Sequence, residues 1–191
     1  MIKQFFIALP FILSIQIVSG QFKNLKKYIP KNYTILDKAY GDINKDGITD
    51  LILILKSKSE SFDADTLARP LLLLKGNGNK LYKLIARNDS VVLCSGCGGL
   101  HGDPYKAIKI NKNNFSITHF GGSGWRWTRV ITFKLNKKLN QFVLYNDGGL
   151  SWHISNPKEW SKNIFNREDF GTLPFTKFSY SNTDKYKFLY K

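Results

Sequence analysis

The sequence predicts a mainly β protein, a single domain of antiparallel meanders whose sheets are propeller-blade-like or sandwich-like. Short apolar runs recur between turns rich in glycine and asparagine, a pattern typical of short strands. The later segments alternate apolar and polar residues, as strands with one buried face do. Helical signals are scarce, so we expect one β-rich domain over residues 21–191, with a partly loose C-terminal tail.

The first half of the domain contains five expected strands. They cover residues 34–39, 51–55, 71–74, 81–86 and 90–93. The run at 51–55 is apolar at every position, which indicates a strand buried on both faces.

The second half contains four alternating segments and one helical signal. The expected strands cover residues 107–110, 115–120, 125–135 and 141–145, with glycine-rich turns at 121–124 and 146–149. Asn156, Pro157 and Glu159 form an N-cap, a first-turn proline and an N3 acid. This pattern predicts one short helix, near the C-terminus, that ends at about residue 165.

Residues 1–20 have the pattern of a secretory signal peptide. Lys3 supplies a positive charge, residues 5–18 are mostly apolar, and small residues precede Gln21. No later stretch approaches the ~20 apolar residues of a membrane-spanning helix. We therefore expect a periplasmic or secreted protein with no membrane span after signal removal.

The charge balance is strongly basic, with 29 Lys and Arg against 14 Asp and Glu and a formal net charge of +15. The lysines are scattered along the chain, which indicates a solvated surface with a weak attraction to acidic envelope polymers. No nucleic-acid-binding module is recognisable, so nucleic acid is not an expected partner. The expected partner is a protein of unknown identity or an envelope glycan.

A candidate calcium loop lies directly before the apolar run at 51–55. Its candidate ligands are the side chains of Asp42, Asn44, Asp46 and Asp50 and the backbone carbonyl of Ile48. These occupy positions 1, 3, 5, 9 and 7 of a calcium-binding loop, and Gly47 permits the sharp turn. Leu53 stands where an EF-hand requires glutamate, which excludes that motif. The alternative is a turn without metal.

The series Gly-Asp-Ile-Asn-Lys-Asp-Gly-Ile-Thr-Asp-Leu at 41–51, with Gly-Asn-Gly-Asn at 76–79, resembles an FG-GAP or VCBS-type repeat. The resemblance implies a calcium loop between adjacent strands of a propeller blade, with Asp42, Asn44, Asp46 and Asp50 as ligands. Residues 28–178 also resemble exported bacterial proteins of unknown function that share the Cys-Ser-Gly-Cys-Gly-Gly and Gly-Gly-Ser-x-Trp-Arg-Trp segments. The chain is too short for a closed ring of blades.

Cys94 and Cys97 are the only cysteines. In an exported protein, two thiols three residues apart favour a small disulfide ring that fixes a glycine-rich turn. A redox site and a zinc site completed by His101 and His119 are the alternatives.

An aromatic and basic cluster flanks the glycine-rich turn at 121–124. Its members are His119, Trp125, Arg126, Trp127 and Arg129. In a strand, Trp125, Trp127 and Arg129 share one face and Arg126 lies on the other. A hairpin loop with an odd number of residues places His119 opposite Trp125 and merges the apolar faces, so we predict that register. The cluster is either a ligand platform or core packing around a satisfied arginine.

These observations favour an exported, non-enzymatic binding or interaction module in which Ca²⁺ is structural. One alternative is a periplasmic inhibitor or immunity-type protein that blocks a secreted enzyme. Another is a hydrolase that uses His119 or His101, although no catalytic motif supports it.

Overall fold

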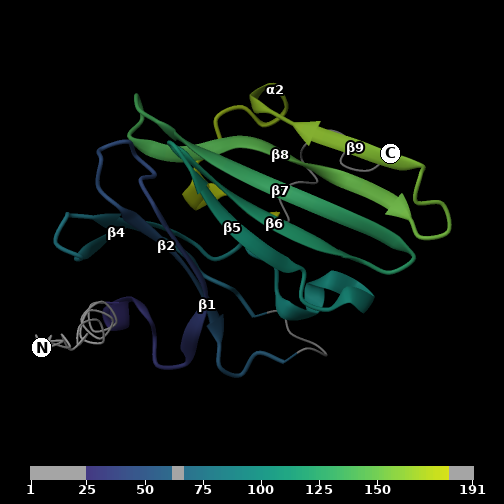
Figure 1. Cartoon of the computed structure of the whole chain (residues 1–191), viewed down its shortest axis with the longest axis horizontal. Coiled ribbons are helices and arrows are strands. Elements are labelled where there is room, and N and C mark those ends of the chain that lie inside the picture. The colour runs from purple at the N-terminus through teal and green to yellow at the C-terminus, as the bar shows by residue number, and fades with distance from the viewer. Residues whose placement is uncertain (1–24, 62–66, 181–191) are drawn as a thin grey trace, which may run out of the picture.

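The computed structural model describes residues 25–61 and 67–180, which form two antiparallel sheets packed as layers (Figure 1). The four-stranded sheet has the order β1-β2-β3-β4, with β1 at Tyr33–Gly41, β2 at Asp50–Ser57, β3 at Leu71–Gly76 and β4 at Tyr82–Asn88. The five-stranded sheet has the order β5-β6-β7-β8-β9, with strands at Tyr105–Asn111, Asn114–Gly122, Trp125–Asn136, Gln141–His153 and Trp160–Phe165. Strands that follow one another in the chain are neighbours in each sheet. The predicted β fold of antiparallel meanders is confirmed, and its layers form a sandwich.

The two central strands of the four-stranded sheet, β2 and β3, are covered on both faces. Alternate residues of β2 and β3, such as Ile52 and Leu73, face the five-stranded sheet. The residues between them, such as Leu53, pack against Leu25 and Tyr28 in and beside the short helix η1 (Lys26–Tyr28). Residues 51–55 are therefore fully buried, as their uninterrupted apolar sequence predicts.

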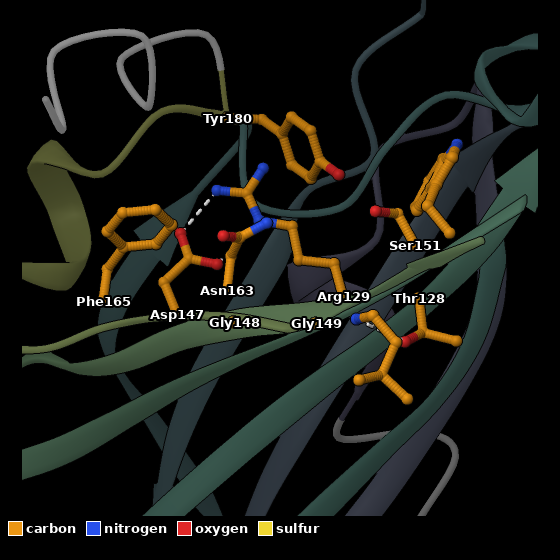
Figure 2. Close-up of a pocket in the computed structure, with 11 residues that line it drawn as sticks. Thr128, Arg129, Asp147, Gly148, Gly149, Ser151, Asn163, Phe165 and Tyr180 are labelled. Carbon is orange, nitrogen blue, oxygen red and sulfur yellow. Dashed lines mark hydrogen bonds and ion pairs between the residues drawn. The ribbon is translucent and has the colours of Figure 1, made fainter. Parts of the chain in front are cut away.

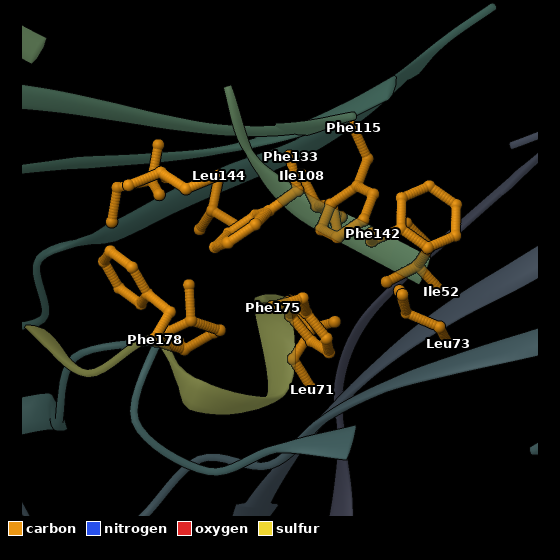
Figure 3. Packing of buried hydrophobic residues seen from close by; sticks show 14 of the residues in the cluster. Ile52, Leu71, Leu73, Ile108, Phe115, Phe133, Phe142, Leu144, Phe175 and Phe178 are labelled. Atoms are coloured by element: carbon orange, nitrogen blue, oxygen red, sulfur yellow. The ribbon is translucent and has the colours of Figure 1, made fainter. Parts of the chain in front are cut away.

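Phenylalanine rings fill the space between the two sheets (Figure 3). Phe115 of β6 and Phe133 of β7 stack with ring centroids 5.4 Å apart. The short helix η3 (Phe175–Lys177) brings Phe175 edge-on to Phe133, at 5.1 Å. The side-chain amide of Asn88 in β4 donates to the backbone carbonyl of Phe175, which holds η3 against the four-stranded sheet. The C-terminal segment therefore completes the core.

The helix predicted from residue 156 to about 165 is wrong, because Trp160–Phe165 is strand β9. This segment pairs with β8 from Asp147 to Trp152 and satisfies backbone groups that would otherwise be unpaired at the edge of that strand. Long-range pairing overrides the local helical signal. The observed helix, α2 (Arg167–Phe170), begins after β9 and has a capping box between Asn166 and Asp169.

Two further differences concern strand boundaries. Residues 90–93 form bends rather than the expected strand, although Val91 and Val92 are buried. Strand β8 continues to His153 through Gly148 and Gly149, which the sequence indicates as a turn. A Cβ at position 149 would lie 1.7 Å from the Thr128 carbonyl oxygen, so glycine permits close contact between β7 and β8.

The expected signal peptide at 1–20 and the last residues of the expected loose tail lie outside the described residues. Within the described ranges, no helix combines the length and the apolar character needed to cross a membrane.

Candidate functional site

The candidate calcium loop connects β1 to β2 and is closed by its own hydrogen bonds. The Asp42 carboxylate accepts four backbone N–H groups at 2.6–3.2 Å, from Asn44, Lys45, Asp46 and Gly47. Gly47 has a φ of +80°, which glycine adopts without strain. Burial opposes ionisation of Asp42, but the amide hydrogen bonds outweigh it and hold the pKa of this carboxyl below its ordinary value.

Asp50 links the loop to the four-stranded sheet. Its side chain is fully buried, and its two oxygens accept the backbone N–H groups of Ile43 at 3.0 Å and Gly76 at 2.9 Å. Burial raises the pKa of Asp50, and repulsion from Asp46 and Asp42 raises it further. The carboxylates therefore lie close enough to repel one another.

Lys75 supplies a positive charge beside this acidic loop. Its Nζ lies 2.9 Å from Asp46 Oδ2, and the ion pair raises the pKa of the lysine. The Ile48 N–H donates to the other oxygen of Asp46 at 3.0 Å. In this arrangement the ammonium group of Lys75 is the cation that contacts Asp46.

The loop fits calcium in the chemistry of its donors, since three carboxylates, an asparagine oxygen and a carbonyl are ligands that a hard cation prefers. The side chains are turned toward loop amides and Lys75, however. Among the described residues, no group of three His, Cys, Asp or Glu side chains is placed to hold a metal. The calcium site therefore stays a prediction, and binding would require Asp46 to release Lys75.

Cys94 and Cys97 lie at disulfide distance in the glycine-rich segment that contains η2 (Ser95–His101), in agreement with the predicted pairing. This segment packs against the end of β6. A Cβ at Gly121 would lie 3.0 Å from the Gly98 carbonyl oxygen and 2.6 Å from the Trp127 ring. The glycines thus allow the disulfide segment and Trp127 to approach β6 closely.

The β6–β7 hairpin has the predicted odd register, but its pairs are shifted along the strands. Gly122 pairs with Arg126 and His119 with Arg129, so three residues lie between the last paired positions. The prediction that His119 lies opposite Trp125 is wrong, because pairing continues through Gly121 and Gly122. Because the number of loop residues is still odd, one face carries His119, Trp125, Trp127 and Arg129, and the other carries Arg126.

His119 is fully buried beneath the segment that precedes the disulfide. Its Nε2 accepts the Leu93 N–H at 3.3 Å, while its Nδ1 is buried without a hydrogen-bond partner among residues 25–61 and 67–180. Burial lowers the pKa of His119 to about 3, and the nearby charge of Arg129 contributes. The imidazole is therefore neutral and out of contact with solvent, so it is not placed to act on a substrate.

Arg129 is a satisfied buried arginine (Figure 2). Its Nε donates to Asp147 Oδ1 at 2.6 Å, and its Nη2 pairs with Oδ2 of the same carboxylate. The Tyr180 ring covers the guanidinium, with 4.0 Å from Arg129 Cζ to the ring centroid. A recess beside the pair is lined by Trp127 and Asn163, among others.

Only one member of the predicted cluster, Trp125, is exposed, and Arg126 lies on the opposite face of the sheet from it. Trp125 is 64% exposed and packs edge-on against His153. Arg126 is half-buried on the other face, where its Nη1 donates to the Gly122 carbonyl at 2.9 Å. Trp127 is partly buried against Gly121. The five residues therefore do not form one ligand platform.

The residues predicted from the sequence do not include a second surface, the face of the five-stranded sheet that is turned away from the four-stranded sheet. We call it the outer face. Around its centre it carries Phe120, Arg126, Thr128, Val130, Leu150, Trp152, Trp160, Lys162 and Ile164. The alternation of Leu150 and Trp152 is a signal for this face, but the preceding glycines and the apparent helix start at 156 obscured it.

No protein-family model, curated protein or solved structure matches the chain. The resemblance to FG-GAP and VCBS-type repeats thus stays a prediction.

Proposed function

We propose that the chain is an exported, non-enzymatic binding module, active in the periplasm or outside the cell, whose β fold is stabilised by calcium. The observation that carries this proposal is the outer face. Trp160 is 57% exposed there and Ile164 is 50% exposed, although both belong to a paired strand. Large apolar side chains grouped on an exposed surface are characteristic of interaction sites.

The calcium part of the proposal is supported by the donors of the loop and by the position of Asp50. Asp50 joins the ends of β1 and β3, so a cation that relieved the repulsion among Asp42, Asp46 and Asp50 would stabilise this junction. Extracellular calcium modules work with dissociation constants of roughly 10⁻⁴–10⁻³ M. Calcium would replace Lys75 as the positive charge next to Asp46.

Thermal unfolding with calcium and with a chelator tests this part. We expect the chelator to lower the Tm of the wild-type protein and Asp46→Ala to abolish that difference. Asp89→Ala is the matched control, because Asp89 pairs with Arg87 away from the loop. Lys75→Met should tighten calcium binding in a calorimetric titration, because it removes the competing ammonium. Identical unfolding curves with and without chelator would contradict calcium stabilisation.

The binding part is tested by retention of the protein on isolated envelope material. The double variant Trp160→Ala, Lys162→Glu alters the outer face on edge strand β9. Its matched control is Tyr40→Ala, Lys38→Glu on edge strand β1, where a lysine and an exposed aromatic ring also stand two residues apart. We expect the outer-face variant alone to lose retention. Equal retention of both variants and the wild type would refute the proposed binding surface.

A further inference from the structure

The strand register arranges the outer face in rows that cross the sheet. The first row contains Arg126, Trp152 and Trp160, on β7, β8 and β9. The second contains Phe120, Thr128, Leu150 and Lys162, on β6 to β9. With strands about 4.8 Å apart, four strands span roughly 14 Å, which exceeds the width of a single sugar ring. The face is therefore broad enough for a polymer.

Aromatic rings occupy both of these rows and lie on β6, β8 and β9. Phe120 and Trp152 have ring centroids 6.2 Å apart and planes inclined by 29°. Trp160 is the cross-strand partner of Trp152 and is more than half exposed. Flat, apolar ring surfaces with polar groups nearby match the C–H faces of sugar rings, which carry hydroxyl groups around their edges.

The charged side chains that strands β5 to β9 place on the outer face are all basic. Its basic side chains come from Lys106, Lys109, Arg126, Lys134 and Lys162. Asp147 is the single acidic residue in strands β5 to β9, and it lies on the opposite face, paired with Arg129. Within these five strands no acidic side chain on the outer face offsets the positive charges, although Glu159 directly precedes β9, so electrostatic complementarity favours an anionic ligand.

Every unit of a polysaccharide built from uronic acids matches both the aromatic rings and the positive charge of the outer face, because each unit has a sugar ring and a carboxylate. Ser116, Thr118 and Thr132 lie on the same face, beyond the aromatic rows, and add hydroxyl groups that can bond to sugar hydroxyls. An acidic polypeptide would supply carboxylates without the rings, and a neutral glycan would supply rings without the charge.

We propose that the outer face binds an acidic polysaccharide, whose rings stack on Phe120, Trp152 and Trp160 while its carboxylates meet Arg126 and Lys162. This inference rests on the proposed function of a binding module and specifies its ligand. The aromatic rows set the position of the chain of sugars, and the flanking lysines extend the contact along the sheet.

The test compares three probes by isothermal titration with the mature full-length chain. Polygalacturonate has rings and charge, its fully methyl-esterified form has rings alone, and poly-L-glutamate has charge alone. We expect polygalacturonate to bind at least about tenfold more tightly than either other probe, which corresponds to about 1.4 kcal/mol. Trp160→Ala with Lys162→Glu should remove at least that factor, whereas Tyr40→Ala with Lys38→Glu should leave the affinity unchanged.

Equal binding of poly-L-glutamate or of the methyl-esterified form would overturn the inference, since charge alone or sugar rings alone would then explain binding. No binding of polygalacturonate would overturn it as well. If retention on envelope material still depends on Trp160 and Lys162 in that case, the ligand assignment fails while the binding module stands. Circular dichroism of both double variants shows whether a lost affinity reflects a lost fold.

Discussion

The two sheets of the sandwich differ in how many of their faces are covered. Strands β2 and β3 of the four-stranded sheet lie between the phenylalanine core and the segment around η1, so their leucines and isoleucines are buried on both faces. The five-stranded sheet is covered on its inner face, while Leu150 and Ile164 on its outer face remain exposed. Packing explains the apolar residues of β2 and β3, but it does not explain those on the outer face of the five-stranded sheet. This difference is the reason we propose the outer face as the binding surface.

The largest expected effect concerns a polar pair on the inner face of the five-stranded sheet. Asp147→Ala leaves the guanidinium of Arg129 buried without a counter-ion, so we expect the free energy of unfolding to fall by about 3–5 kcal/mol. Urea unfolding measures this loss. The double variant Arg129→Met, Asp147→Leu should recover most of it, since no charge is then buried. A loss below about 1 kcal/mol for Asp147→Ala would show that the pair is solvated.

The difference in burial between the two sheets can be tested by replacing one leucine in each sheet with alanine. Leu53→Ala removes a side chain with no exposed surface, and we expect it to lower the free energy of unfolding by about 2–5 kcal/mol. Leu150→Ala makes the same chemical change on the outer face, where the expected effect is within about 0.5 kcal/mol. The denaturant midpoints of the two variants, compared with that of the wild type, measure these two losses of stability. Equal losses would mean that the outer face is packed against something in solution.

An effect that builds up gradually as the pH falls comes from His119. Burial lowers the pKa of its imidazole from 6.5 to about 3, so between these values the unfolded chain binds more protons than the folded protein. The stabilisation from a neutral His119 is complete above pH 6.5 and is lost as the pH falls toward 3, by about 1.4 kcal/mol per pH unit. Urea unfolding from pH 7 to pH 4.5 should show this slope.

His119→Gln is the control for that slope, because glutamine can accept the Leu93 N–H but does not titrate. The variant should depend less on pH below 6.5 than the wild type. Parallel pH profiles for the two proteins would mean that His119 is protonated in the folded state or that another group causes the slope.

Features set by local patterns could be predicted from the sequence. The burial of β2 follows from an apolar run without interruption, and the parity of the β6–β7 hairpin follows from the gain in merging two apolar faces. The predicted pairing of Cys94 with Cys97 agrees with their distance. Each of these depends on residues that are close together in the chain.

The features that could not be predicted depend on contacts between distant parts of the chain. Strand β9 contains a run that follows a good helix start, and its partner in β8 is interrupted by glycines that resemble a turn. The buried partner of Arg129 is Asp147, which the sequence places in that apparent turn. The outer face could be recognised only after the register of four strands had been fixed.

The position of β9 has a consequence for self-association. Among the described strands it forms the border of its sheet, and such borders can recruit a strand from another molecule. β9 has six residues, and Lys162 lies in its middle. Antiparallel docking of two copies along this border would bring two ammonium groups together, so the same lysine that is proposed to attract a ligand would also keep the molecules apart.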